Sequence, residues 1–234
     1  MTVGADFPAR LHAWLDRHHP GSEPIALAYS GGGDSHALLC IAAEWARARG
    51  SELHALTIDH DLRPDSGAEA RRAVDAARRL GARAEVLCWR GDKPEHGLQA
   101  AARQARHALL AETCRARHIT QLLLAHTRDD QAETVWMRLQ AGAGWRGLAA
   151  MAERVASPVW PQGRGVEILR PLLDLRRTDL RDYLTATGER WIDDPSNQDR
   201  RYARIRARQR LGTLETAGLK TERLAVLARD LGAI

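Results

Sequence analysis

Short apolar runs alternate with longer helical patterns along the first 140 residues of the chain. The segments between the runs repeat apolar residues at helical spacing. Strands alternating with helices form right-handed crossovers, so the pattern predicts an α/β fold built on a doubly wound parallel sheet with helices on both faces. The predicted buried strands are 25–29, 53–58, 84–88 and 121–125, and the predicted helices are 36–49, 66–80, 98–118 and 130–140.

The pattern changes after about residue 150. Residues 157–175 are rich in proline and glycine, which is typical of a short hairpin. A helix is expected at 176–187, and a very basic helix further on. We expect a main domain at 1–211, with its core at 24–150 and an extension at 151–211, followed by a helical tail at 212–234.

Three polar segments each come directly after a predicted strand. They read SGGGDS at 30–35, DHDLRPDS at 59–66 and HTRDDQAET at 126–134. The carboxyl ends of parallel strands meet at one edge of a sheet, and ligands bind there. We therefore expect the three segments to share one edge.

The first of these segments has the composition of a phosphate cradle. Glycines after a strand expose backbone amides, and the start of the next helix adds positive charge. The lysine of a Walker A loop and the dinucleotide G-x-G-x-x-G fingerprint are both missing. Asp34 would repel a phosphate unless a divalent cation joined the two, so the segment predicts pyrophosphate binding with a bridging cation. A plain glycine turn with Asp34 capping the helix is the alternative.

This segment resembles the PP-loop, S-G-G-x-D-S, of the ATP pyrophosphatases. The resemblance implies a Rossmann-like fold and an enzyme that cleaves ATP to AMP and pyrophosphate while adenylating a second substrate. It also implies a set of ATP-binding residues, with Asp34 as a magnesium ligand. These are Ser30, Gly31, Gly32, Gly33, Asp34, Ser35 and Asp59.

Later segments resemble one branch of this family, the tRNA(Ile)-lysidine synthetases. Residues 59–66 are similar to D-H-G-L-R-x-x-S, with Asp61 where glycine is usual, and residues 126–134 are similar to H-x-x-D-D-Q-x-E-T. The resemblance covers about residues 24–211. In this family the acidic pair matched by Asp130 and Glu133 recognises lysine, which implies a lysine site made of His126, Asp129, Asp130 and Glu133. Unpaired, Asp130 and Glu133 would repel one another on one helix face and favour a cation between them.

Arginines form the predicted contacts to phosphate groups. Arg103 and Arg106 lie on one face of the helix at 98–118, where two guanidiniums can hold a triphosphate or the leaving pyrophosphate. The resemblance also matches Asp194, Ser196 and Asn197, together with several arginines. The predicted tRNA contacts are Arg63, Arg170, Arg204, Arg206 and Arg208.

The implied reaction has two steps. The wobble cytidine of tRNA(Ile) with a CAU anticodon is adenylated at C2 by ATP, and free L-lysine then displaces AMP to form lysidine. The catalytic residues would be Asp34, Arg103, Arg106, Asp130 and Glu133, with the choice of general base between the last two left open. Two alternatives are a tRNA-thiolating enzyme, which generally needs cysteines near its site, and an RNA-binding module that has lost catalysis.

Composition agrees with this interpretation. The net charge is +5, and almost all positive groups are arginines, because only Lys93 and Lys220 are lysines. Three cysteines without a C-x-x-C pair predict buried structural thiols and no disulfide or metal site. A signal peptide and a membrane span are not predicted, so we expect a cytoplasmic enzyme, in a short form without the further C-terminal domains of many family members. The sequence does not predict the oligomeric state.

Overall fold

The computed structural model describes residues 6–192, 203–218 and 220–233. They fall into two compact units, one formed by Met1–Ala125 with Arg154–Pro171 and the other by His126–Glu153 with Leu172–Ile234. The matched residues Asp194, Ser196 and Asn197 lie outside the described residues, as do Arg200 and Arg201. The domain bounds expected from the sequence stay a prediction.

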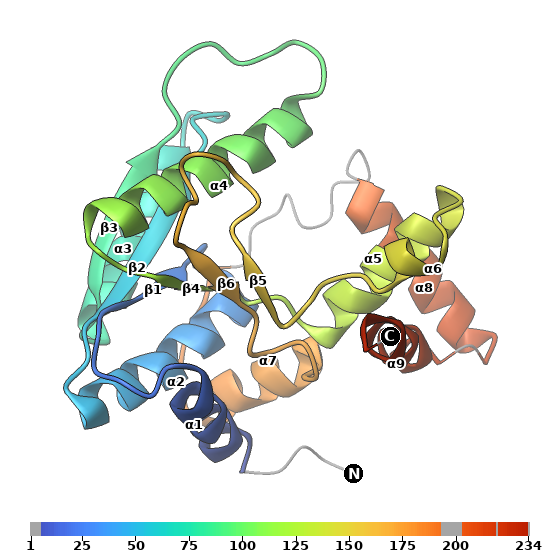
Figure 1. Cartoon of the computed structure of the whole chain (residues 1–234), viewed down its shortest axis with the longest axis horizontal. Helices are drawn as coiled ribbons and strands as arrows, with labels where there is room; N and C mark the ends of the chain where they lie inside the picture. Colours follow the sequence, from blue (N-terminus) through green and yellow to red (C-terminus); the bar gives the residue numbers. More distant parts are fainter. Residues whose placement is uncertain (1–5, 193–202, 219, 234) are drawn as a thin grey trace. The chain divides into compact units, whose positions relative to one another are not determined.

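The first unit contains a six-stranded sheet with the order β3-β2-β1-β4-β6-β5 (Figure 1). Every neighbouring pair is parallel except β5 and β6, which are antiparallel. The α/β prediction is therefore confirmed. The hairpin was predicted within residues 157–175, but its first strand lies earlier, at Arg154–Ala156. The strands are β1 Ile25–Ala28, β2 Leu53–Asp59, β3 Arg83–Cys88, β4 Gln121–Leu123, β5 Arg154–Ala156 and β6 Glu167–Leu169.

Four helices belong to this unit: α1 Phe7–His18, α2 Gly33–Arg49, α3 Ser66–Arg79 and α4 Leu98–Ala116. The chain runs from β1 outward to β2 and β3, then returns through α4 to β4 on the other side of β1. With right-handed crossovers, α2 and α3 cover one face of the sheet and α4 the other. The strand order therefore reverses between β1 and β4, and the residues that follow β1 lie at this switch point, where α/β sheets bind ligands.

The core of the sheet alternates from face to face, as the pleat of a strand requires. Leu110 and Cys114 of α4 pack against Ala26 of β1, Leu56 of β2 and other residues of the same face. Leu110 is fully buried. Truncating such a leucine to alanine typically lowers the free energy of unfolding by about 2–5 kcal/mol. The packing of α4 on the sheet therefore stabilises the strands that carry the site.

Two expectations of burial were wrong. Residues 84–88 were predicted as a buried strand, but β3 ends the sheet and is only half-buried, because it has a neighbour on one side alone. Three buried thiols were predicted as well. Cys114 is buried, whereas Cys40 is half-buried and Cys88, the last residue of β3, is exposed.

The described part of the second unit is helical. Its helices are α5 Arg128–Gln140, α6 Trp145–Leu148, α7 Arg177–Ala186, α8 Ala203–Thr216 and α9 Glu222–Gly232. The helices predicted at 130–140 and 176–187 and the basic helix are thus confirmed. Helix α5 contacts α6, α8 and α9. Among the described residues, no helix has both the length and the apolar character that crossing a bilayer requires.

Candidate functional site

The glycine loop, residues 30–35, connects β1 to α2. Its Gly31 has a φ of +80°, and its two serines join the ends of the loop: their hydroxyl oxygens lie 3.1 Å apart, and Ser35 Oγ donates to Gly32 O at 2.9 Å. The first α2 hydrogen bond runs from His36 N to Gly32 O. The amides of residues 33–35 therefore come before the helical ladder and can donate to an anion, aided by the helix dipole.

Gly31→Ala is expected to lower the free energy of unfolding by about 1–2 kcal/mol, because a left-handed φ strains a residue with a Cβ. Gly32→Ala is the matched control. Gly32 has a φ of −71°, and an added Cβ would meet only Ser30 Oγ, at an ordinary 3.5 Å. Urea unfolding of both variants measures the difference. Equal losses would contradict a special backbone conformation at Gly31.

The segment after β2 also forms a turn. Asp59 is buried, and its Oδ1 accepts a hydrogen bond from Asp61 N at 2.9 Å. Asp61 has a φ of +52°, a conformation that glycine adopts freely and that aspartate tolerates better than most residues. The aspartate therefore keeps the turn that a glycine would favour. Arg63 pairs with Glu69 of α3 at 2.9 Å, and its predicted contact with tRNA stays a prediction.

A cluster of guanidiniums surrounds His107 of α4. Burial, and after it the charges of Arg106, Arg103 and Arg170, lower the pKa of His107 to about 4. Arg170 is itself buried, and its pKa is lowered by burial and then by Arg103. Burial and then Arg106 also lower the pKa of His60, which follows β2. Three positive charges around a neutral imidazole create a strongly electropositive region, which suits the phosphates of a nucleotide.

His107 should make stability depend on pH. Its pKa is about 4 in the fold against the ordinary 6.5 of a histidine, so as the pH falls the unfolded chain binds this proton before the folded chain does. The stabilisation is complete above pH 6.5 and is lost as the pH falls through about 4. Between about pH 4 and pH 6.5, the free energy of unfolding should rise with pH. We expect His107→Phe to lower this slope by up to about 1.4 kcal/mol per pH unit. Denaturant titrations at pH 4.5–7 test this, and identical slopes in both proteins would contradict it.

In the second unit, α5 begins with a capping box. Thr127 is fully buried, and both its amide and its hydroxyl donate to Asp130 Oδ2, at 2.8 and 2.9 Å. Asp129 Oδ2 accepts a hydrogen bond from Arg177 N, the first amide of α7, at 2.9 Å. One aspartate therefore caps its own helix, and the other ties the starts of α5 and α7 together.

Asp130 and Glu133 share one face of α5, as their spacing predicts, and both are buried. Arg177 Nη2 lies 3.2 Å from Asp130 Oδ1, and Arg177 Nη1 lies 3.6 Å from Glu133 Oε1. Arg208 Nε donates to Glu133 Oε1 at 2.7 Å, and Arg204 Nε lies 3.4 Å from Glu133 Oε2. The carboxylate pair was expected to favour a cation, and guanidinium cations of α7 and α8 lie against it.

The two carboxyl groups have pKa values shifted in opposite directions. Burial raises the pKa of Asp130, but Arg177, Arg204 and His126 together with the Thr127 amide outweigh it, so its pKa is lowered. Burial and the neighbouring Asp130 raise the pKa of Glu133, despite Arg208 and Arg177. Pairs shifted apart in this way are typical of acid–base sites. Asp130 is suited to hold a charge and Glu133 to accept a proton.

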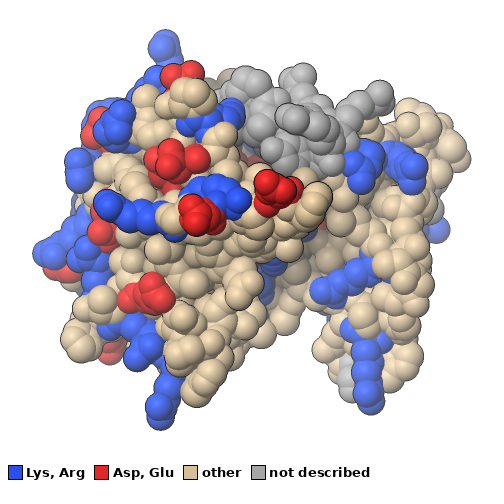
Figure 2. All heavy atoms as spheres, turned by 90° about the horizontal axis from the view of Figure 1, so that it is seen from above, with Lys and Arg blue, Asp and Glu red and all other residues tan. Residues whose placement is uncertain are grey.

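Arg177 is a site residue that the sequence pattern did not predict. Its signal was an arginine at the start of a helix that follows an apolar run, which is too common to single out. The half-buried His126 was expected near the carboxylates, and its charge does act on Asp130. Net charge did not locate a binding surface either. On the face seen in Figure 2, Lys and Arg side chains are spread out, with Asp and Glu among them.

Comparison with known proteins supports the interpretation of the glycine loop. A model of the PP-loop domain family matches residues 6–215. The chain belongs to the PP-loop domain family. The glycine loop at the end of β1 is thus the PP-loop, at the position where the sequence analysis expected it.

Several curated relatives of this PP-loop protein carry the same name. A tRNA(Ile)-lysidine synthase of Caulobacter vibrioides is 50% identical over 201 residues, which are 85% of this chain and 48% of that protein. One of Ruegeria pomeroyi is 42% identical over 232 residues, 99% of this chain and 54% of its own length. The chain thus spans about half the length of these relatives.

A solved structure shares the PP-loop fold. The U34-tRNA thiolase NcsA from Methanococcus maripaludis, with its 4Fe-4S cluster, superposes with a TM-score of 0.77 at 16% identity. The match covers 97% of this chain and 80% of that one. At this identity, the likeness shows the fold alone.

Proposed function

We propose that this chain carries the catalytic machinery of a tRNA(Ile)-lysidine synthase. The observation that carries the proposal is the buried pair Asp130 and Glu133, which already binds cationic groups within a PP-loop protein. A site that accepts guanidinium groups can accept the ammonium group of lysine, because both are cationic donors that pair with carboxylate oxygens. The names of the curated relatives support the same activity.

In the first step, ATP is bound by the PP-loop and the C2 oxygen of the wobble cytidine attacks the α-phosphorus. The amides of residues 33–35 receive the β- and γ-phosphates. Arg103 and Arg106, with the electropositive region around His107, stabilise the negative charge that passes to pyrophosphate. Removing one such preorganised donor typically lowers the rate of the reaction by about 10²–10³.

Asp34 is the residue that fits Mg²⁺. It is half-buried in the first turn of α2, between Gly33 and Ser35, whose amides would receive phosphate. Mg²⁺ prefers one or two carboxylates together with phosphate oxygens. When bound, the ion would neutralise phosphate charge, and Asp34 would hold it at the loop.

In the second step, the ε-amine of lysine attacks C2 of the adenylated cytidine and AMP leaves. Asp130 stays ionised and anchors the ammonium form, while Glu133, whose pKa is raised, takes the proton that makes the amine nucleophilic. Arg204 and Arg208 have side chains 36% and 38% exposed, against 14% for Arg177. The incoming amine therefore replaces contacts of Arg204 and Arg208, which are less buried than Arg177, at least cost.

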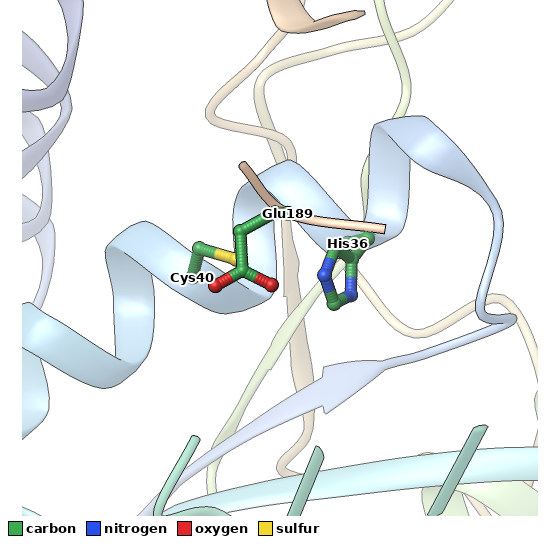
Figure 3. A group of neighbouring side chains, drawn as sticks. All are labelled: His36, Cys40 and Glu189. Carbon is green, nitrogen blue, oxygen red and sulfur yellow. The ribbon is translucent and has the colours of Figure 1, made fainter. Parts of the chain in front are cut away.

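Thiolation is less consistent with the cysteines. They lie on different elements: Cys40 in α2, Cys88 at the end of β3 and Cys114 in α4. Burial raises the pKa of Cys114 to about 12, so it remains an unreactive thiol. Cys40 follows His36 by one turn of α2 (Figure 3), and Tyr29 Oη lies 2.9 Å from Nδ1 of this buried histidine.

The test uses labelled lysine. Purified chain, ATP and Mg²⁺ are incubated with a tRNA(Ile) transcript that carries CAU, and with a matched transcript in which the wobble C is replaced by U. We expect ATP-dependent transfer of label to the first RNA alone. Labelling of neither RNA, or labelling by sulfur donors in place of lysine, would refute the proposal.

A further inference from the structure

Helix α8 divides its arginines between two faces. Arg204 Nη2 lies 3.0 Å from Thr134 Oγ1, and Arg208 Nε lies 2.7 Å from Glu133 Oε1, so both side chains face α5. Arg206 and Arg210 are each two positions further along, and two residues turn an α-helix by about 200°. Both are exposed. The sequence predicts RNA contact for Arg206 and Arg208 alike, but the structure gives the two residues different surroundings.

Arg206 and Arg210 line a cavity of about 430 Å³. This size lies in the range of small-ligand sites, roughly 300–1,000 Å³. The described residues around it come from the last turn of α5 and from α8. They are Met137, Gln140, Ala141, Ala203, Arg206, Ala207 and Arg210.

The lining has a distinct chemistry. Its charged members are Arg206 and Arg210, and its other side chains are a thioether, an amide and three methyl groups. Two guanidiniums four residues apart on one helix can hold one phosphate in a bidentate manner. The apolar side offers a flat base a surface free of competing charge, and the amide of Gln140 can pair with a base edge. Phosphate and base together describe a nucleotide.

We propose that this cavity binds one unstacked nucleotide of the RNA substrate, with its phosphate between Arg206 and Arg210 and its base against Met137. The inference rests on the proposed function, because it takes an RNA as the ligand. It adds a site further along α5, since Met137 and Gln140 follow Glu133 by about one and two helical turns. Arg206 thereby acts as an RNA contact, whereas Arg208 acts on Glu133.

The experiment compares double variants of the full chain by fluorescence anisotropy with a labelled anticodon stem-loop RNA. Arg206→Gln with Arg210→Gln is expected to weaken binding about tenfold or more and to reduce the slope of log Kd against log salt by about 1. The control, Arg72→Gln with Arg79→Gln, makes the same change of charge on the exposed side of α3. It should leave both quantities near the wild-type values.

A third variant separates shape from charge. Ala141→Leu fills the cavity from its exposed rim and keeps both arginines, so it should weaken binding several-fold with the salt slope unchanged. Wild-type affinity and slope in both cavity variants, or equal losses in the α3 control, would overturn the inference. Lysine transfer by the wild-type chain is assayed in parallel. Its absence would refute the proposed function, while the comparison of RNA affinities still decides the cavity.

Discussion

Glu133→Gln is expected to reduce lysine transfer by about 10²–10⁴, the usual contribution of a positioned general base. Pyrophosphate exchange into ATP, measured with RNA present, should continue, because it reports the first step alone. The raised pKa of Glu133 also sets the direction of the pH profile. The base works when ionised, so transfer by the wild-type chain should fall as the pH drops through this pKa, and the variant should lose that dependence.

Two controls accompany Glu133→Gln. Glu112→Gln makes the same chemical change at an exposed position of α4 and should transfer lysine normally. The second control is thermal unfolding, which shows whether the Glu133→Gln chain is folded. It is needed because the neutral glutamine amide removes the charge that pairs with Arg208. A folded Glu133→Gln chain with normal lysine transfer would rule out the proposed base.

Asp34→Asn is expected to reduce AMP formation by about 10²–10³, because an amide holds Mg²⁺ poorly beside the phosphates. The loss should be partly recovered at high Mg²⁺. Asp75→Asn, on the exposed side of α3, is the matched control. The two main variants should thus fail at different steps. Asp34→Asn would lose both exchange and transfer, whereas Glu133→Gln would lose transfer alone.

If Asp34→Asn kept normal exchange, Asp34 would not be a magnesium ligand. If both variants lost exchange equally while folded, the division of roles between the PP-loop and α5 would be wrong. Release of AMP and pyrophosphate, followed separately from lysine incorporation, distinguishes these results.

Much of the fold could be predicted because its elements have local causes. The run at 25–29 became β1, Ile25–Ala28, and the segment 66–80 became α3, Ser66–Arg79. Strand order is not local, so the pattern could not show that β3 lies at the edge and is half-buried. Helix α1 was missed although Phe7, Leu11, Trp14 and Leu15 are buried at helical spacing, a signal that was present.

The candidate site was predictable to the same extent. The PP-loop needs neighbouring glycines, and Asp130 and Glu133 need only one helix, so short spacings reveal both. Their partners come from distant segments: Arg177 is 47 residues from Asp130, and Arg208 is 75 residues from Glu133. Counting arginines predicted RNA contacts for the whole basic helix. Only packing shows which of them face carboxylates.

In the proposed reaction, the α-phosphate of ATP passes to an RNA base before lysine reacts. The decisive experiment incubates the chain with ATP labelled at the α-phosphorus, Mg²⁺ and the CAU transcript without lysine. We expect label on the RNA, which is released as AMP when lysine is added. AMP formation with no label ever on the RNA, or labelled RNA that lysine does not discharge, would contradict this reaction.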